Sequence, residues 1–165
     1  MNRFSTLTAI MALCLGIAVA TDRAGARQKS LTETIIGTWS VTAVSDQYED
    51  GKKSNAWGDG MKGNLIFDRN GRFSHILIGE KQPKRRADDP RRPDALVVAY
   101  FGSYTVNEKD KVVSVWIERG TNSARDGEAQ KWAVTMRGDT LALIGSPHND
   151  SQGLFSQHLE IKRAM

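Results

Sequence analysis

The sequence predicts an all-β protein, an eight-stranded up-and-down antiparallel barrel preceded by a short N-terminal helix. From about residue 38 onward, apolar and polar residues alternate in short runs rich in Val, Ile, Thr and aromatic residues, which is typical of strands with one buried face. Asn70-Gly71 and Gly138-Asp139 separate neighbouring runs and are typical of tight hairpin turns. Because most runs are joined by hairpins, they form a meander, and closure into a barrel removes its two exposed edges.

The helix is predicted from its N-terminal cap. Ser30-Leu31-Thr32-Glu33 has the spacing of a capping box, in which Ser and Glu satisfy each other's backbone N–H groups. We therefore expect a short helix over residues 31–36 that stops at Gly37.

Eight strands follow, with two long connections. The predicted strands cover residues 38–45, 64–68, 72–78, 100–106, 111–118, 130–137, 140–144 and 155–162. Residues 46–62 are polar and glycine-rich, and residues 79–96 are very basic, with a short helix expected around 94–98. Long loops in a compact domain are often lids or binding loops.

The first twenty residues have the parts of a secretory signal peptide. Arg3 is their only charge, and an apolar run over 7–20 ends in Ala18-Val19-Ala20. The pattern predicts a leader over 1–20, a flexible mature N-terminus over 21–30 and a barrel domain over 31–165, in a secreted or periplasmic protein. Ala24-Gly25-Ala26 offers an alternative cleavage site.

Two membrane-anchored alternatives fit this leader less well. An uncleaved anchor would need about 20 apolar residues, more than the run provides. A lipoprotein anchor would use Cys14, but Leu13 stands where a small residue is expected. Cys14 is the only cysteine, so the mature chain would have no disulfide.

Composition and motifs argue against several classes of function. Removing the predicted leader, which contains Arg3, leaves 22 Lys and Arg against 19 Asp and Glu. The resulting net charge of +3 does not by itself indicate nucleic-acid binding. The sequence has no stripe of alternating basic and aromatic residues, no cysteine or histidine pair at metal-ligand spacing and no G-x-S-x-G nucleophile motif. We expect no nucleic-acid partner, no metal and no cofactor.

An ordered set of motifs resembles the bacterial and fungal lipocalin-like domain family. The matching segments are Ile36-Gly37-Thr38-Trp39, Lys62-Gly63-Asn64-Leu65-Ile66-Phe67 with Asn70-Gly71-Arg72-Phe73, Tyr100-Phe101-Gly102-Ser103-Tyr104-Thr105-Val106, and Gly138-Asp139-Thr140-Leu141-Ala142-Leu143. The resemblance spans about residues 31–164 and implies a lipocalin-like barrel with a ligand cavity, but no substrate. Many relatives have a His in the strand after the Tyr-x-x-x-Tyr run, where this chain has Val115-Trp116.

The resemblance also assigns a structural pair. Gly37-Thr38-Trp39 is similar to the Gly-x-Trp signature of lipocalins, in which the Trp closes the barrel floor and an Arg after the last strand lies across it. Here these residues would be Trp39 and Arg163, and an Arg above an indole is a cation–π contact of about 0.5–2 kcal/mol.

Six strand residues are candidates for the wall of a ligand cavity, with plain core packing as the alternative for each. They are Phe67, Phe73, His75, Tyr104, Trp116 and Trp132. Alternation places either Tyr100, Gly102 and Tyr104 or their neighbours inside, and a one-residue slip exchanges the two sets. His75 is in phase with Phe73, and an inward imidazole could orient a ligand or act as a general base.

The segment 81–92 is unusually basic. Its candidates for an anion-attracting rim at the barrel mouth are Lys84, Arg85, Arg86, Arg91 and Arg92. Such a rim could recruit an acidic ligand or an anionic lipid surface. The alternative is a solvated mobile loop.

These observations favour an exported binding protein that holds a small hydrophobic molecule in the barrel. One alternative is an enzyme of the isomerase or cyclase type that uses the same cavity, with His75, Tyr104 and Glu118 as candidate acid–base groups. Another is an envelope protein that binds partners through its two long loops. The sequence does not predict the oligomeric state.

Overall fold

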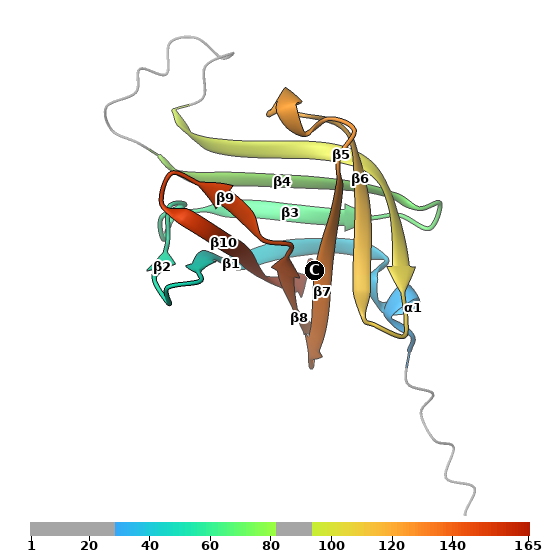
Figure 1. Cartoon of the computed structure of the whole chain (residues 1–165). Coiled ribbons are helices and arrows are strands. Elements are labelled where there is room, and N and C mark those ends of the chain that lie inside the picture. The colour runs from blue at the N-terminus through green and yellow to red at the C-terminus, as the bar shows by residue number, and fades with distance from the viewer. Residues whose placement is uncertain (1–28, 82–93) are drawn as a thin grey trace, which may run out of the picture.

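The computed structural model describes residues 29–81 and 94–165 (Figure 1). The predicted leader, most of the predicted flexible N-terminus and the basic residues Lys84, Arg85, Arg86, Arg91 and Arg92 lie outside the described residues.

A short helix precedes a chain of strands. The elements are α1 (Leu31–Ile35), β1 (Gly37–Tyr48), β2 (Lys53–Ser54), β3 (Lys62–Phe67), β4 (Arg72–Lys81), β5 (Ala95–Asn107), β6 (Val112–Gly120), the 3-10 helix η1 (Ser123–Arg125), β7 (Ala129–Arg137), β8 (Thr140–Gly145), β9 (His148–Asp150) and β10 (Gly153–Arg163). No helix in the described ranges has the length and apolar character needed to cross a membrane.

The strands form one closed antiparallel barrel. Neighbouring strands follow the order β2-β1-β3-β4-β5-β6-β7-β8-β10-β9, and pairing of β1 with β10 closes the sheet. The eight long strands correspond to the eight predicted ones, and β2 and β9 are short additions at the rim. The predicted fold class, an eight-stranded up-and-down barrel with a short N-terminal helix, is confirmed.

Two connections differ from the prediction. The helix expected around 94–98 is wrong, because this segment begins β5 and pairs with β4, with Ala95 opposite Lys81 and Val97 opposite Ile78. Long-range pairing here outweighs local helix preference. The polar connection 46–62 is also more ordered than expected, since β1 extends to Tyr48 and β2 pairs back onto it.

The barrel has a closed and an open end (Figure 1). Hairpins at 68–71, 107–111 and 138–139 gather at the closed end beside α1. The connections 49–61, 121–128 and 146–152 lie at the open end. One apolar cluster fills the interior between them and includes Leu65, Phe67, Leu77, Val113, Leu141 and Ile161.

Trp39 and Arg163 meet at the closed end. They are paired across β1 and β10, and the Arg163 guanidinium carbon lies 4.2 Å from the centre of the Trp39 ring. Trp39 Nε1 donates to Ile35 O at 2.7 Å, and Arg163 Nη1 donates to Ile36 O at 3.0 Å. Gly37 has φ +130°, and a Cβ there would lie 2.4 Å from Arg163 Nη1. The glycine of the Gly-x-Trp motif therefore makes room for the arginine.

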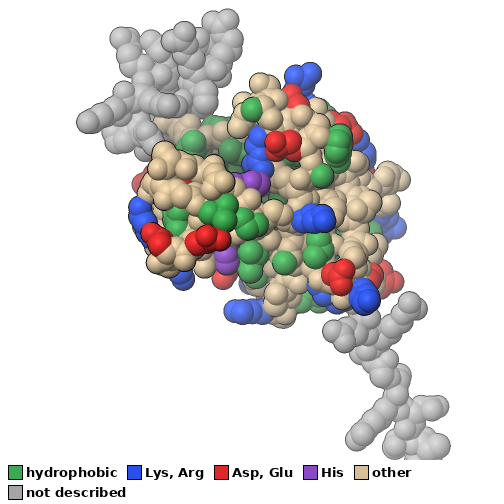
Figure 2. Space-filling model, viewed as in Figure 1, with side chains coloured by type: hydrophobic (Ala, Val, Ile, Leu, Met, Phe, Trp, Pro, Cys, Tyr) green, Lys and Arg blue, Asp and Glu red, His purple; other side chains and the backbone are tan. Residues whose placement is uncertain are grey.

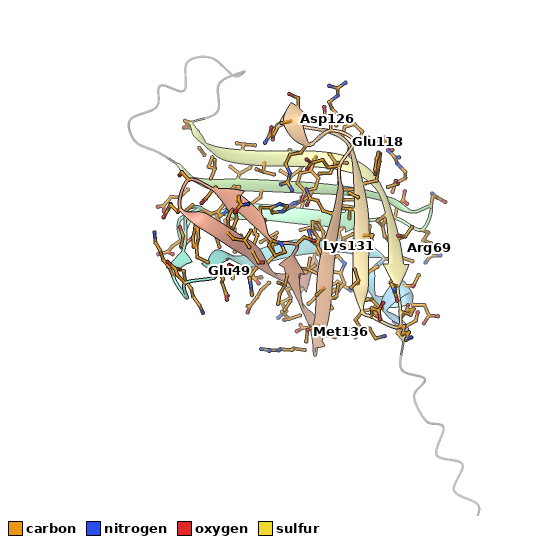
Figure 3. The ribbon with its side chains drawn as sticks, in the orientation of Figure 1. Glu49, Arg69, Glu118, Asp126, Lys131 and Met136 are labelled. Atoms are coloured by element: carbon orange, nitrogen blue, oxygen red, sulfur yellow. The ribbon has the colours of Figure 1, made fainter. Side chains whose placement is uncertain are left out.

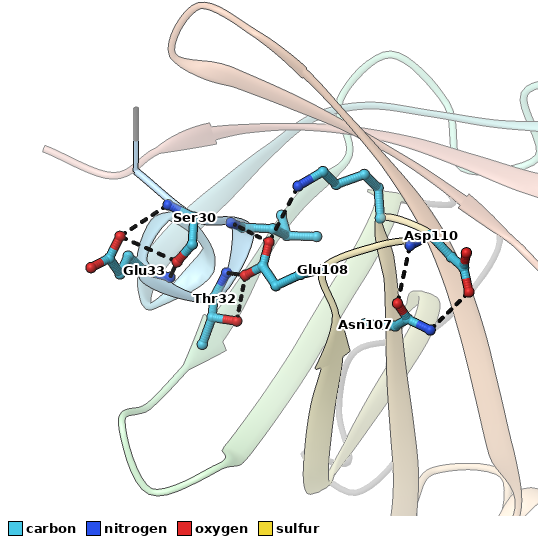
Figure 4. A network of polar contacts seen from close by, with 8 residues as sticks. Ser30, Thr32, Glu33, Asn107, Glu108 and Asp110 are labelled. Atoms are coloured by element: carbon cyan, nitrogen blue, oxygen red, sulfur yellow. Dashed lines mark hydrogen bonds and ion pairs between the residues drawn. The ribbon is translucent and has the colours of Figure 1, made fainter. Parts of the chain in front are cut away.

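Glu108 secures α1 from the hairpin between β5 and β6 (Figure 4). Its carboxylate accepts from Leu31 N at 3.0 Å and from Thr32 N and Oγ1, both at 2.6 Å. These hydrogen bonds lower the pKa of Glu108 to about 2. The predicted capping box between Ser30 and Glu33 forms at the same helix end. A helix of five residues is unstable alone, so these contacts hold it in place.

Candidate binding pocket

A pocket of about 80 Å³, open to solvent, lies at the open end of the barrel. Three of the open-end connections supply residues to it, namely Trp57 between β2 and β3, Arg125 in η1 and His148 in β9. Strands β5, β7, β8 and β10 supply the remaining walls. The pocket is therefore a product of the closed barrel together with its loops.

Aromatic and aliphatic side chains form most of the walls. The rings come from Trp57, Tyr100, Trp132, Phe155 and His148, and the aliphatic contacts from Val98 and Leu159. Trp57 and Trp132 are 6% and 3% exposed, so both are fixed by packing before any ligand arrives. Gly145 also faces the pocket, and a Cβ there would meet Trp132 Cδ1 at an ordinary 3.7 Å.

Gln130 is a buried polar residue in this wall. It is 5% exposed, and its Nε2 has no hydrogen-bond partner within the described residues. Leaving a buried donor unpaired costs about 1–3 kcal/mol. Gln130 thus presents an unused donor in a largely apolar pocket.

Arg125 and His148 contact each other at the mouth. Arg125 Nη2 lies 3.3 Å from His148 Nε2. Because a guanidinium only donates, Nε2 must accept, and the imidazole is neutral with its proton on Nδ1. Burial and the nearby Arg125 charge lower the pKa of His148, which agrees with the neutral form.

The connection that bears Arg125 is fixed by its neighbour Asp126. Asp126 Oδ1 accepts from Gly120 N at 2.9 Å, and Oδ2 pairs with Arg119 at 3.1 Å. Figure 3 shows Asp126 at this connection, close to the end of β6 that carries Glu118. Arg125 is therefore presented by an ordered turn.

Two carboxylates, those of Asp46 and Asp150, lie near the mouth beside residues that line the pocket. Asp46 is buried behind Gln157, whose Nε2 lies 3.5 Å from Asp46 Oδ1, and burial raises the pKa of Asp46. The backbone N–H of Gln152, followed by the Tyr48 hydroxyl, which donates to Asp150 Oδ2 at 2.8 Å, lowers the pKa of Asp150. Neither carboxylate lines the pocket.

A second space of about 70 Å³ continues beyond Arg125. It lies between β5, β6 and the η1 connection, and it shares Val98, Tyr100 and Arg125 with the first. Arg125 and Tyr100 therefore form a partition between two small spaces.

The predicted cavity residues divide into those near this pocket and those in the core. Trp132 lines the pocket. Phe67 and Phe73 are 1% and 4% exposed and pack in the filled part of the barrel, 6.4 Å apart between ring centres. Tyr104 packs edge-on against Phe67 and donates to Asp68 O at 2.7 Å, at the closed end. The alternative left open by the sequence is settled, since Tyr100 and Tyr104 face inward and Phe101 is 46% exposed.

The prediction that Trp116 lines the cavity is wrong. Trp116 is 50% exposed on the outside of β6, whereas Val113, Val115 and Ile117 of the same strand face inward. Strand alternation explains this orientation, because Val115 and Ile117 on either side of Trp116 are each 1% exposed and take the inward positions.

His75 faces inward, as its phase with Phe73 predicts. It is 1% exposed beside Tyr100 and Trp132, with ring centres 5.0 and 6.0 Å away, and neither ring nitrogen has a hydrogen-bond partner within the described residues. Burial lowers the pKa of His75 to about 4, so it is neutral at pH 7.

The three candidate acid–base residues do not converge. His75 is in the core, Tyr104 is bonded at the closed end, and Glu118 is exposed and paired with Arg72. The pairing lowers the pKa of Glu118. Among the described residues, no group of three or more His, Cys, Asp or Glu could hold a metal ion.

The outer surface offers a wider hollow of different character. It measures about 380 Å³ and lies over β1, β7, β8 and β10, with Lys53, Arg137 and His158 among its lining residues. These polar side chains are exposed or half-exposed and remain solvated. On the face shown in Figure 2, basic side chains are interspersed with acidic and apolar ones.

Sequence reasoning missed most of the residues at the mouth. Gln130 shares the inward phase of Trp132, and Phe155 and Gln157 share that of Leu159, so alternation could have identified these three. Trp57, Arg125 and His148 lie on the loops and short elements between the eight predicted strands, where no periodic pattern reports orientation.

Comparisons with known proteins identify the relationship of the chain. A family model described as a lipocalin-like domain matches residues 36–163. No curated protein matches the chain. Among solved structures, a lipocalin-like protein from Bacteroides uniformis is similar with 16% identity and a TM-score of 0.44, covering 79% of this chain and 99% of its own. An uncharacterized protein from Bacteroides eggerthii has 14% identity and a TM-score of 0.41, covering 78% and 98%.

Proposed function

Since this chain belongs to the lipocalin-like domain family, we propose that it is an exported binding protein that holds a small, largely apolar molecule at the open end of its barrel. The observation that carries the proposal is the solvent-open pocket with rigid aromatic walls and a few polar side chains. Small-molecule sites in proteins are typically apolar concavities of this composition.

The volume of the pocket limits the ligand. Pockets for drug-sized ligands measure about 300–1,000 Å³, whereas this one measures about 80 Å³. The bound part is therefore small, about one ring or a short aliphatic chain, and the rest of a longer molecule would emerge at the mouth. Burying about 100 Å² of apolar surface contributes about 2.5 kcal/mol, less than the ~4 kcal/mol that corresponds to a Kd of 1 mM. Useful affinity thus requires polar contacts as well.

The test of binding begins with native mass spectrometry of the mature protein purified from a bacterial host, followed by organic extraction. We expect a small organic passenger or, for an emptied protein, saturable binding of benzyl alcohol followed by NMR. Failure of both would contradict the proposal.

Filling the pocket should abolish binding. In Gly145→Val, the added methyl groups project into the pocket, and the glycine has no positive φ that would strain the change. We expect at least tenfold weaker binding of benzyl alcohol with little change in Tm. Ala142→Val is the matched control, because Ala142 lies on the same strand and lines the outer hollow. Equal binding by both variants would place the ligand elsewhere.

Export rests on the leader pattern and has its own test. The full-length chain is expressed in a bacterial host, the cells are fractionated, and the mass of the protein in each fraction is measured. We expect a periplasmic or secreted protein that begins after Ala20 or Ala26. Retention of the full-length mass in the cytoplasm would contradict export without affecting the binding proposal.

A further inference from the structure

The electrostatic balance of the pocket is one-sided. Arg125 is the only charged side chain lining either small space among the described residues, and no Asp or Glu lines them. Asp46 lies behind the lining residue Gln157 and Asp150 is on β9 with His148, but neither lines the two spaces. The described lining therefore carries a net positive charge.

The charge of Arg125 has little competition. Its ion pair with Glu128 is long, 3.5 Å from Nε, and Glu128 is half-exposed, so the pair is weak. His148 holds Arg125 at Nη2 without neutralising it, because the imidazole is the neutral acceptor. Arg125 itself is half-buried, which strengthens any contact it makes to an anion.

Gln130 supplies a second, independent observation. Its amide nitrogen is a buried donor without a partner in the described structure, and Gln130 lines the same space as Arg125. Buried polar groups in proteins are almost always paired. Gln130 lines the same pocket as Arg125, and a donor left unpaired in the described structure favours an acceptor that arrives with the ligand.

We propose that the pocket recognises a small organic carboxylate, whose anionic head is bound by Arg125 and Gln130 and whose apolar body packs against Trp132 and Phe155. His148 acts as a positioning residue that fixes the guanidinium at the mouth. This inference rests on the proposed function and adds the chemical class of the ligand. Trp132 and Phe155 line the first space, about 80 Å³ and open to solvent, which is smaller than the ~150 Å³ cavity that holds one benzene molecule, so a single-ring body would extend into the mouth.

The first test uses the unmodified mature protein and three probes of similar shape: benzoate, benzyl alcohol and benzylamine. Their Kd values are measured by NMR titration at neutral pH, with the indole signals of Trp57 and Trp132 as reporters. We expect benzoate to bind at least about tenfold more tightly than benzyl alcohol, and benzylamine to bind most weakly, because charge-assisted hydrogen bonds are the stronger kind.

The outcomes separate the two proposals. If benzyl alcohol binds as well as or better than benzoate, the pocket is a binding site but the carboxylate assignment is wrong. If none of the three probes binds, both proposals fail for ligands of this size.

The second test removes the charge. Arg125→Gln should weaken benzoate binding about tenfold or more and leave benzyl alcohol binding within about twofold. The matched control is Arg69→Gln, an exposed arginine of the hairpin between β3 and β4 at the closed end, far from the pocket. We expect it to leave both affinities unchanged. Equal loss of benzoate binding in the two variants would show a general charge effect and overturn the assignment to Arg125.

Discussion

The two ends of the barrel use their polar side chains differently. At the closed end, Trp39 Nε1, the Arg163 guanidinium and the Glu108 carboxylate all bond to α1 or the residues that follow it. Gln130 Nε2 in the pocket wall and both ring nitrogens of His75 in the core are instead buried without partners in the described structure, as is Thr34 Oγ1 in α1. Satisfied groups add stability, whereas unsatisfied ones reduce it.

This contrast suggests that the two ends of the barrel have different roles, stability at the closed end and binding at the open end. The closed end sets the register of β1 and β10 and holds the helix, so changes there should affect folding first. The open end carries the pocket, and its unpaired Gln130 amide lowers stability where a ligand could use it. Such costs are typical of functional sites.

The largest effect is expected at the closed end. Trp39 is 2% exposed, so Trp39→Ala would leave a large cavity and remove the ring under Arg163. We expect the free energy of unfolding, measured by urea titration, to fall by about 3–5 kcal/mol. Benzyl alcohol binding by the folded fraction should be unchanged.

Trp116→Ala is the control for this change. Trp116 is half-exposed, so the same substitution there should cost less than about 1 kcal/mol. If the two variants were equally stable, the closed end would not be the stabilising end.

The next largest effect is a pH dependence due to His75. An unfolded histidine has a pKa of about 6.5, whereas burial lowers the pKa of His75 to about 4. Between these values the unfolded chain binds a proton that the folded chain does not, so stability falls as the pH is lowered from about 6.5 to 4. The loss from this residue is about 3 kcal/mol.

His75→Phe isolates this contribution. Phenylalanine suits the aromatic surroundings of Tyr100 and Trp132 and carries no titrating group. Urea titrations of both proteins at several pH values should show a steeper acid-side loss for the wild type. Parallel curves would mean that His75 is paired or protonated in the folded protein.

Sequence alone was sufficient where a pattern has a single structural solution. The capping box at Ser30, the Asn70-Gly71 turn and the pairing of Trp39 with Arg163 depend on local or terminal motifs, and each has the geometry that the motif specifies. The inward direction of His75 followed from its phase with Phe73 in a strand that has no bulge between them.

Phase errors arose where both faces of a strand carry apolar residues. In β6, Val115, Trp116 and Ile117 are all hydrophobic, and ring size favoured Trp116 as the interior residue. The other residues of the strand show which face is buried. The polar residues Ser114 and Glu118 share the phase of Trp116, whereas the apolar Val113 shares the phase of Val115 and Ile117. Counting the whole strand would have placed Trp116 outside.

Most of the pocket could not be predicted from the sequence. Arg125, His148 and Trp57 come from three connections separated by tens of residues and meet because the barrel closes. No local sequence pattern indicates that these three residues are close together, because their proximity depends on pairings between distant strands. Gln130 was the exception, since it follows the phase of Trp132.

The smallest expected effect is a change in the free energy of unfolding that has opposite signs for two glutamines of the same pocket. Gln130→Leu removes the unpaired amide and keeps an apolar side chain of similar size, so we expect the free energy of unfolding to rise by about 1–2 kcal/mol. Gln157→Leu should instead lower it, because Gln157 is the hydrogen-bond partner of the buried Asp46. Both free energies come from urea titration, and benzoate affinity is measured in parallel.

If Gln130 is kept for ligand binding, Gln130→Leu should be more stable than the wild type and bind benzoate several-fold more weakly. A destabilised Gln130→Leu variant would mean that the amide is already paired in the folded protein, and Gln130 would then offer no free donor to a ligand.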